Sequence, residues 1–267
     1  MDPQASIPGF SFPLSGGLFR VAVRGLGLTP DLHVLDLFSG QGAAALRLAR
    51  DPGCSVTAVE SDPTLCRRAR EYARAIGVEG RVSVRQMDPQ RLELPAQSFD
   101  AVFALGAAPT VLGRGALLER CHFYLRPGGH LLLADIVYLD SPVSATGRQL
   151  LSEIRSDEPL EAQGNAPGPV VRGLLEQGRY RFETESDYRQ LLEAMGYAVE
   201  FSFLSPESEW AEYFERMSRE YGDRHAHEGD ADARTRLCEE AAAYYALGGR
   251  ASVGYLVLSA RCLEYED

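Results

Sequence analysis

The stretch His33-Val34-Leu35-Asp36-Leu37-Phe38-Ser39-Gly40-Gln41-Gly42 decides the fold, because it joins an apolar run to a glycine-rich turn. The run from 33 to 38 is compact and apolar, which is typical of a buried strand. Residues 43 to 50 follow it and are good helix formers. Glycines at such a junction let the backbone turn sharply and approach a ligand. The stretch therefore predicts a strand, a turn and a helix. Either a nucleotide-like ligand lies at the turn, or the turn is only a tight connection.

The same unit repeats along the chain. Residues 55 to 60 predict a second strand, and Asp62-Pro63 opens a helix that extends to Ile76. Further strands are predicted over 82–87, 99–105, 130–138, 197–203 and 252–262, with helices over 114–125, 186–195 and 209–221. Strands that alternate with helices form a parallel sheet covered on both faces. The sequence therefore predicts a doubly wound α/β fold.

The pattern also divides the chain into four regions. Residues 1–30 predict an N-terminal arm, mobile over 1–17 where Pro, Gly and Ser are frequent, followed by a helix over 18–27. Residues 31–138 form the predicted α/β core. Residues 139–183 predict an insertion that covers the core, with a helix over 148–155 and a loop over 161–169. Residues 184–267 complete the core and carry a two-helix insertion at about 206–248, whose second helix spans 231–247.

Composition and charge limit the partners, the metal content and the location that we expect for the protein. The net charge of -11 would repel a phosphate backbone, so we expect a small or cationic partner and no nucleic acid. The five cysteines are widely spaced and predict neither a disulfide framework nor a metal site. The N-terminal residues do not show the pattern of an export signal and the apolar runs are short, so we expect neither export nor a membrane span. We therefore expect a cytoplasmic protein without a metal.

Acidic residues end three successive strands: Asp36, Glu60 and Asp88. Ligands of open α/β sheets bind at the carboxyl ends of such strands. Glu60 could accept hydrogen bonds from both hydroxyls of a ribose, and Asp88 could accept one from the amino group of adenine while Met87 packs on the ring. Taken singly, Glu60 could be a solvated strand end and Asp88 a turn cap. Together the three acids favour a nucleoside site.

At these motifs the sequence resembles the class I S-adenosylmethionine-dependent methyltransferases. The resemblance covers residues 18 to 138 by motif and includes the turn Leu125-Arg126-Pro127-Gly128-Gly129. It is closest to the ubiquinone/menaquinone-biosynthesis type and related small-molecule enzymes, which also have a Trp-containing helix (208–210) and a Tyr-Tyr pair (244–245) before the last strand. Phe38 departs from the pattern, since the family often has glycine or cysteine there.

The resemblance implies a Rossmann-like, mostly parallel seven-stranded sheet whose last strand lies antiparallel beside the fifth, with helical cover insertions. It implies S-adenosylmethionine as cofactor and S-adenosylhomocysteine as product. The residues expected to bind the cofactor are Asp36, Phe38, Ser39, Gly40, Gln41, Gly42, Glu60, Ser61, Met87, Asp88, Pro89 and Leu105.

Methyl transfer from a sulfonium is an in-line displacement to N, O, C or S, so the protein needs no nucleophile of its own. No catalytic residue is assigned. Candidates on the acceptor side are Asp135, Tyr138, Trp210 and Tyr213, with 244–245 as a further aromatic lining and 105–107 as an apolar wall. Asp135 could instead cap a turn or pair with an arginine, and the aromatic residues could be core. His225 and His227 lack a third ligand nearby and are expected in solvent.

Two other functions remain open. Residues 40–45 also fit the Gly-x-Gly-x-x-Ala fingerprint of an NAD(P)-dependent oxidoreductase, although such a site does not call for Asp36, Asp88 or the turn at 125–129. A non-catalytic module that binds S-adenosylmethionine would keep the same pocket. The chain lacks the Asp-Pro-Pro-Tyr type and Pro-Cys motifs of DNA methyltransferases. We expect a small-molecule acceptor and allow for a homodimer.

Overall fold

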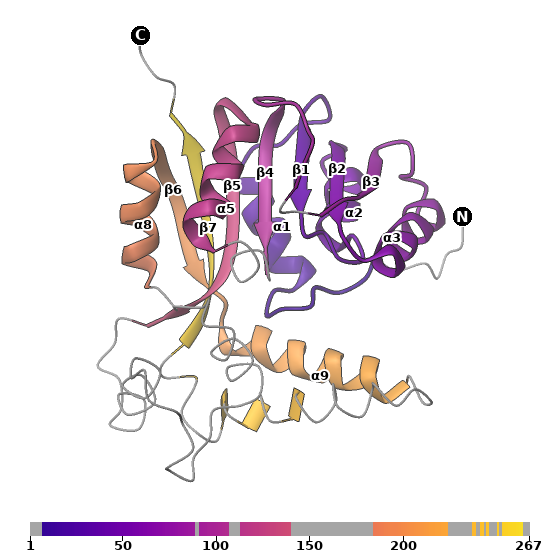
Figure 1. Ribbon diagram of the computed structural model, residues 1–267. Helices are drawn as coiled ribbons and strands as arrows, with labels where there is room; N and C mark the ends of the chain where they lie inside the picture. The colour runs from indigo at the N-terminus through magenta and orange to yellow at the C-terminus, as the bar shows by residue number, and fades with distance from the viewer. Residues whose placement is uncertain are drawn as a thin grey trace.

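The computed structural model describes residues 7–88, 91–106, 113–139, 184–223, 237–238, 241–242, 244–245, 250 and 253–263. These residues form a seven-stranded sheet with the strand order β3-β2-β1-β4-β5-β7-β6 (Figure 1). Its strands are β1 (His33–Leu37), β2 (Ser55–Glu60), β3 (Val82–Gln86), β4 (Phe99–Leu105), β5 (Leu125–Tyr138), β6 (Tyr197–Leu204) and β7 (Val253–Cys262). The predicted doubly wound α/β sheet is confirmed.

The five N-terminal strands are parallel, and β7 is antiparallel to both of its neighbours, β5 and β6. The predicted place of the last strand beside the fifth is therefore confirmed. The central strands are apolar because helices cover both faces of the sheet. Four of the five residues of β1 and six of the seven residues of β4 are buried.

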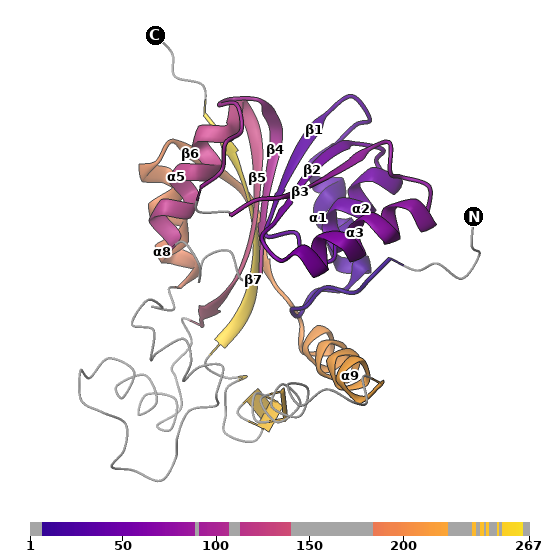
Figure 2. The ribbon, with the colours of Figure 1, turned by 45° about the vertical axis from the view of Figure 1, so that its right-hand side comes forward.

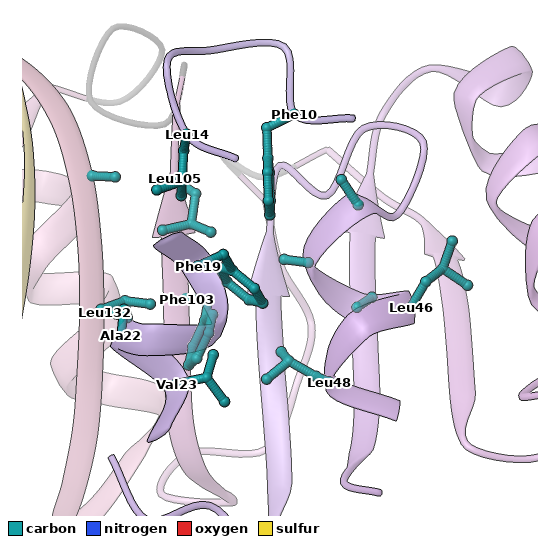
Figure 3. Packing of buried hydrophobic residues seen from close by; sticks show 14 of the residues in the cluster. Phe10, Leu14, Phe19, Ala22, Val23, Leu46, Leu48, Phe103, Leu105 and Leu132 are labelled. Carbon is teal, nitrogen blue, oxygen red and sulfur yellow. The ribbon is translucent and has the colours of Figure 1, made fainter. Parts of the chain in front are cut away.

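Helices cover both faces (Figure 2). One face carries α1 (Gly16–Gly25), α2 (Ala43–Arg50) and α3 (Pro63–Ala75), and the other carries α5 (Arg114–Tyr124) and α8 (Glu185–Ala194). The hydrophobic core is accordingly divided into two clusters, and Figure 3 shows the one under α1 and α2, with Phe19 of α1 close to Phe103 of β4. The helix α9 (Glu207–Asp223) lies beyond the carboxyl ends of the parallel strands. Within the described ranges, none of the helices combines the length and apolar character needed to cross a membrane.

Local signals fix where the helices begin. The carboxylate of Asp62 accepts hydrogen bonds from the backbone N–H groups of Thr64 (2.6 Å) and Leu65 (3.2 Å), and Pro63 occupies the first turn of α3. Thr184 and Asp187 form a reciprocal capping box at α8. Side chains of this kind satisfy N–H groups that have no partner inside the helix.

Some predicted boundaries differ from the observed ones. The predicted turn at 125–129 belongs to β5, which begins five residues earlier than predicted and bulges there, because Phe99 pairs with Leu125 and Ala101 with His130. The predicted helix 148–155 and loop 161–169 lie outside the described residues. The predicted helix 231–247 is described only at 237–238, 241–242 and 244–245, which are helical.

The expectation of a mobile arm over 1–17 is wrong for residues 7–15. Phe10 is 3% exposed and Leu14 is 1% exposed, and both belong to the core cluster under α1 and α2. With the partly buried Phe12 between them, apolar side chains recur at every second position, as in an extended chain that buries one side. The high content of Pro, Gly and Ser concealed this pattern.

A buried polar network ties the α5 and α8 layer to the sheet. The guanidinium of Arg114 donates to the carboxylate of Asp135 (2.9 Å) and to the hydroxyl of Tyr188 (2.8 Å), and that hydroxyl donates to the same carboxylate (2.5 Å). The side chains of Arg114 and Asp135 are only 7% and 2% exposed. A charge pair at such depth stabilises the fold only while both partners remain.

We expect Arg114→Met to lower the free energy of unfolding by about 3 kcal/mol or more, because the Asp135 carboxylate then stays buried without its cation. Urea denaturation measures the change. The matched control is Arg126→Met, which removes the half-exposed ion pair with Asp100 and should cost less than about 1 kcal/mol. Equal losses in the two variants would contradict the role given to the buried pair.

Candidate functional site

Asp36 and Glu60 lie at the carboxyl ends of the neighbouring strands β1 and β2. Asp36 is 2% exposed, and its carboxylate accepts a hydrogen bond from the backbone N–H of Ala45 in α2 (3.2 Å). Burial raises the pKa of the Asp36 carboxyl to about 7; the hydrogen bond from Ala45 opposes the shift, and the negative charge of Glu60 adds to it. The edge of the sheet therefore holds two carboxylates close enough to influence each other.

The Glu60 carboxylate accepts hydrogen bonds from backbone N–H groups of the glycine turn and of the two residues that follow β2. Its Oε2 accepts from Gly40 (3.0 Å), and its Oε1 accepts from Ser61 (2.8 Å) and Asp62 (3.0 Å). The contact with Gly40 holds the glycine turn against the end of β2. Each carboxylate oxygen can accept two hydrogen bonds, so Oε2 has room for one from a ligand hydroxyl. The sequence predicted the acid but not this second role.

The turn after β1 runs through a strained backbone. Phe38 has φ of 57°, a left-handed conformation that costs a residue with a side chain about 1 kcal/mol or more. This explains why a glycine is frequent at this position in the family that the sequence resembles. Gly40 also has positive φ (56°), and a Cβ there would have no neighbour within 4 Å. The backbone at Gly40 therefore borders open space.

Ser39 supplies a further indication of a ligand. Its hydroxyl is buried and has no hydrogen-bond partner among the described residues. Buried polar groups are rarely left in that state without a functional reason. The unpaired hydroxyl, the space at Gly40 and the remaining acceptor position on Glu60 together fit a ligand that carries hydroxyl groups and positive charge, as S-adenosylmethionine does.

The remaining predicted cofactor residues lie along the same edge. Glu60 pairs with Gln86, and the N–H of Met87 donates to the carbonyl oxygen of Glu60 (3.0 Å), so Asp88 follows directly beside the end of β2. Asp88 and Ser61 are exposed, whereas Gln41 and Met87 are half-buried and Gly42 and Leu105 are buried. Pro89 lies outside the described residues.

The acceptor-side candidates are less closely grouped. Asp135 binds Arg114 and Tyr188 in the buried network described above. Besides a role toward the acceptor, the sequence allowed a turn cap or a pair with an arginine, and the structure shows the arginine pair. Trp210 and Tyr213 of α9 are 3% and 8% exposed and belong to a core cluster. The ring of Trp210 stacks on Tyr244 at 4.2 Å. This burial agrees with the core interpretation, and a lining role stays a prediction.

The structure does not describe the side chains of three further candidates. Tyr138 ends β5, and its side chain is outside the described part of the chain, as are His225 and His227. Sequence reasoning also missed the partners of the site: Arg114 and Tyr188 around Asp135, and the segment 7–15, whose Phe12 lies against the end of β4. The only signal for that segment was its alternating apolar pattern.

Comparison with known proteins agrees with the fold and the motifs. A family model described as a methyltransferase domain matches residues 34–129. The chain is 34% identical over 148 residues to the methyltransferase GfsG of Streptomyces halstedii, covering 54% of this chain and 52% of that protein. Over the first relatives, the chain spans about half of the relative's length or less.

Two further similarities extend over more of the chain. A carboxy-S-adenosyl-L-methionine synthase of Geobacter metallireducens is 31% identical over 204 residues, which are 73% of this chain and 79% of that protein. The crystal structure of a SAM-dependent methyltransferase from Thiobacillus denitrificans superimposes with a TM-score of 0.70 at 20% identity, covering 94% of this chain and 93% of that one. With its sheet order, its acidic strand ends and its glycine turn, the chain belongs to the family of class I S-adenosylmethionine-dependent methyltransferases.

Proposed function

We propose that the chain binds S-adenosylmethionine at the carboxyl edge of its sheet and transfers the methyl group to a small-molecule acceptor. The observation that carries the proposal is the hydrogen-bonded unit of Glu60 and the glycine turn, next to the buried carboxyl of Asp36. Such a unit offers negative charge and free hydrogen-bonding positions at the place where ligands of these sheets bind. It fits the cofactor better than a dinucleotide, whose site does not call for the acids at 36 and 88.

The residues of the chain would act by holding and shielding the reactants. Glu60 would accept from the ribose hydroxyls, Asp88 from the adenine amino group, and the Asp36 carboxylate would stabilise positive charge on the ligand. The cofactor, when bound, supplies an activated methyl group. The walls of the site would exclude water and align the acceptor, a contribution that can reach roughly 7 to 11 kcal/mol in favourable cases. No protein nucleophile takes part.

The acceptor is proposed to be a small molecule because the net charge of -11 disfavours a nucleic acid. A cytoplasmic location and a homodimer stay predictions.

A second candidate function comes from the Geobacter metallireducens relative, which is named a carboxy-S-adenosyl-L-methionine synthase and whose similarity covers more of this chain than that of GfsG does. Both candidate functions require the same nucleoside site. In the first the cofactor gives up its methyl group, and in the second the cofactor itself is carboxylated.

Calorimetry and mass spectrometry test the proposal in two steps. We expect the purified protein to bind S-adenosylmethionine and S-adenosylhomocysteine and not to bind NADPH. Incubation with S-adenosylmethionine and a panel of amines, phenols, quinols and thiols should then give S-adenosylhomocysteine and an acceptor heavier by one methylene. A parallel incubation adds a panel of carboxylic acids as carboxyl donors, and a cofactor made heavier by a carboxyl group only in their presence would support the second candidate. Binding of NADPH alone would refute both.

Glu60→Gln should weaken the binding of S-adenosylhomocysteine by about 1 to 3 kcal/mol, because the amide loses the charge-assisted hydrogen bonds to the turn and to the ribose. Isothermal titration calorimetry measures the loss. The control is Glu71→Gln, an exposed acid on α3, which should bind like the unmodified protein. If both variants bind equally well, the ribose site has been misplaced.

Asp36 makes stability depend on pH in a defined direction. Its folded-state pKa of about 7 lies above the 3.8 of an aspartate carboxyl in an unfolded chain, so ionisation destabilises the fold progressively as the pH rises from about 4 to 7, and the penalty is complete above that range. We expect Asp36→Asn to stabilise the protein by on the order of 2 kcal/mol at pH 8, with a difference that shrinks towards pH 4. Thermal unfolding at both pH values measures it.

The same variant should bind S-adenosylhomocysteine more weakly at pH 8, since it lacks the negative charge that a cationic ligand attracts. A gain in stability together with a loss of affinity would show that Asp36 is retained for binding. A difference in stability that is the same at pH 4 and pH 8 would contradict the raised pKa.

A further inference from the structure

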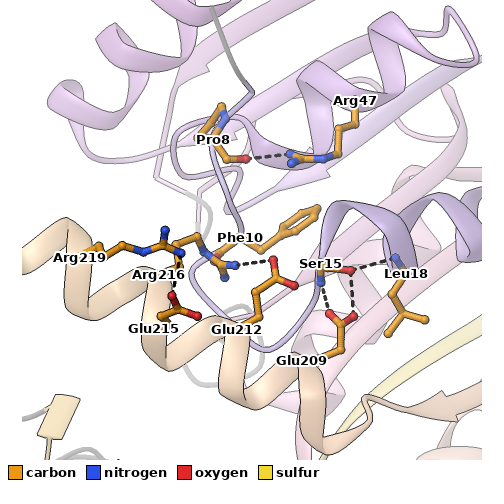
Figure 4. A network of polar contacts seen from close by, with 10 residues as sticks. All are labelled: Pro8, Phe10, Ser15, Leu18, Arg47, Glu209, Glu212, Glu215, Arg216 and Arg219. Atoms are coloured by element: carbon orange, nitrogen blue, oxygen red, sulfur yellow. Dashed lines mark hydrogen bonds and ion pairs between the residues drawn. The ribbon is translucent and has the colours of Figure 1, made fainter.

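Residues 7–15, hereafter the strap, connect two helices that lie far apart in sequence (Figure 4). Arg47 of α2 donates to the carbonyl oxygen of Pro8 (2.8 Å), and Arg216 of α9 donates to that of Phe10 (2.5 Å). The hydroxyl and the backbone N–H of Ser15 both donate to the carboxylate of Glu209, also of α9, and the hydroxyl bond is 2.9 Å long. Charged side chains thus hold the strap at both ends and in the middle.

The strap crosses the edge of the sheet where the cofactor residues lie. Phe12 is stacked on Tyr255 of β7, with ring centroids 5.3 Å apart. A Cβ on Gly106, which follows β4, would lie 2.7 Å from a ring atom of Phe12, so only glycine leaves room for the ring. Gly106 also has φ of 77°, which glycine adopts without strain. The strap therefore runs from α2, which begins at the glycine turn, to the end of β4 and the beginning of β7.

The two residues of α9 that bind the strap lie on one side of that helix. Glu209 and Arg216 are seven residues apart, a spacing that places them on the same face. The side chain of Arg216 is 16% exposed, whereas Glu215 and Arg219 form an ion pair that is 72% and 68% exposed. On α2, burial lowers the pKa of the Arg47 guanidinium to about 10, and its charge lies 5.0 Å from the ring of Phe10. The half-buried cations Arg47 and Arg216 are directed at the strap, and the exposed pair is not.

We propose that the strap is part of the ligand site. Phe12 acts as a positioning residue that closes the site at the carboxyl end of β4, and Glu209 and Arg216 of α9 hold it closed. The inference rests on the proposed function, because it takes the ligand to lie between the glycine turn and Leu105. We expect such a ligand to leave past Phe12, by a movement of the strap that breaks its anchors and exposes Phe10 and Leu14. The strap therefore controls how fast the ligand dissociates.

The experiment measures the dissociation rate of tritium-labelled S-adenosylhomocysteine, chased with unlabelled compound, from the full-length protein. The double variant Glu209→Gln/Arg216→Met should release it at least about tenfold faster, the factor expected from the loss of a charge-assisted hydrogen bond. The matched control is Glu215→Gln/Arg219→Met, which removes the exposed pair of the same helix and should stay within roughly twofold of the unmodified protein.

Two further measurements examine Phe12 and the movement of the strap separately. Phe12→Ala should also accelerate release, whereas Phe123→Ala, at a side chain that is 55% exposed on α5, should not. Amide hydrogen exchange over 7–15 should slow when S-adenosylhomocysteine is added to the unmodified protein.

Unchanged release from both Phe12→Ala and the double variant, with faster exchange over 7–15, would show that the strap is only a structural tether and would overturn the inference while leaving the proposed function intact. Failure of the unmodified protein to bind S-adenosylhomocysteine would overturn both.

Discussion

The hydrogen bonds between the Glu60 carboxylate and the backbone of Gly40, Ser61 and Asp62 are the contacts on which the site depends. They join the glycine turn after β1 to the end of β2 and so set the shape of the edge where the two strands finish. They also fix a negative charge near Asp36, in a region from which water is largely excluded. Electrostatic interactions are strong in such surroundings, and a ligand that brings positive charge and hydroxyl groups relieves the repulsion.

Stability and binding are served by different parts of the molecule. The sheet interior and its two helical layers hold a well-packed core, and Arg114 with Asp135 locks one of those layers to β5. The edge, in contrast, contains a strained residue at Phe38, an unpaired buried hydroxyl at Ser39 and a carboxyl with a raised pKa at Asp36. Natural proteins concentrate such unfavourable features at functional sites, where a ligand compensates for them.

The fold could be predicted because its strongest signals are local. Strands β2 and β4 coincide with the predicted ranges, since buried parallel strands are continuous apolar runs between turn residues. The acidic strand ends could be predicted because parallel strands bring their carboxyl ends to one edge. The partners of Asp135 could not, because Arg114 and Tyr188 are 21 and 53 residues away and meet it only in the folded chain. The position of 7–15 was missed for the same reason, since its anchors Glu209 and Arg216 lie 194 and 206 residues from the strap residues that they bind.

A crystal structure of the protein with S-adenosylhomocysteine would show whether Glu60 and the glycine turn form the nucleoside site. We predict that the ribose hydroxyls lie within hydrogen-bonding distance of the Glu60 carboxylate and that the ligand passes along Gly40 towards Leu105. A ligand that is bound elsewhere, or that leaves Glu60 in contact with backbone groups alone, would contradict it.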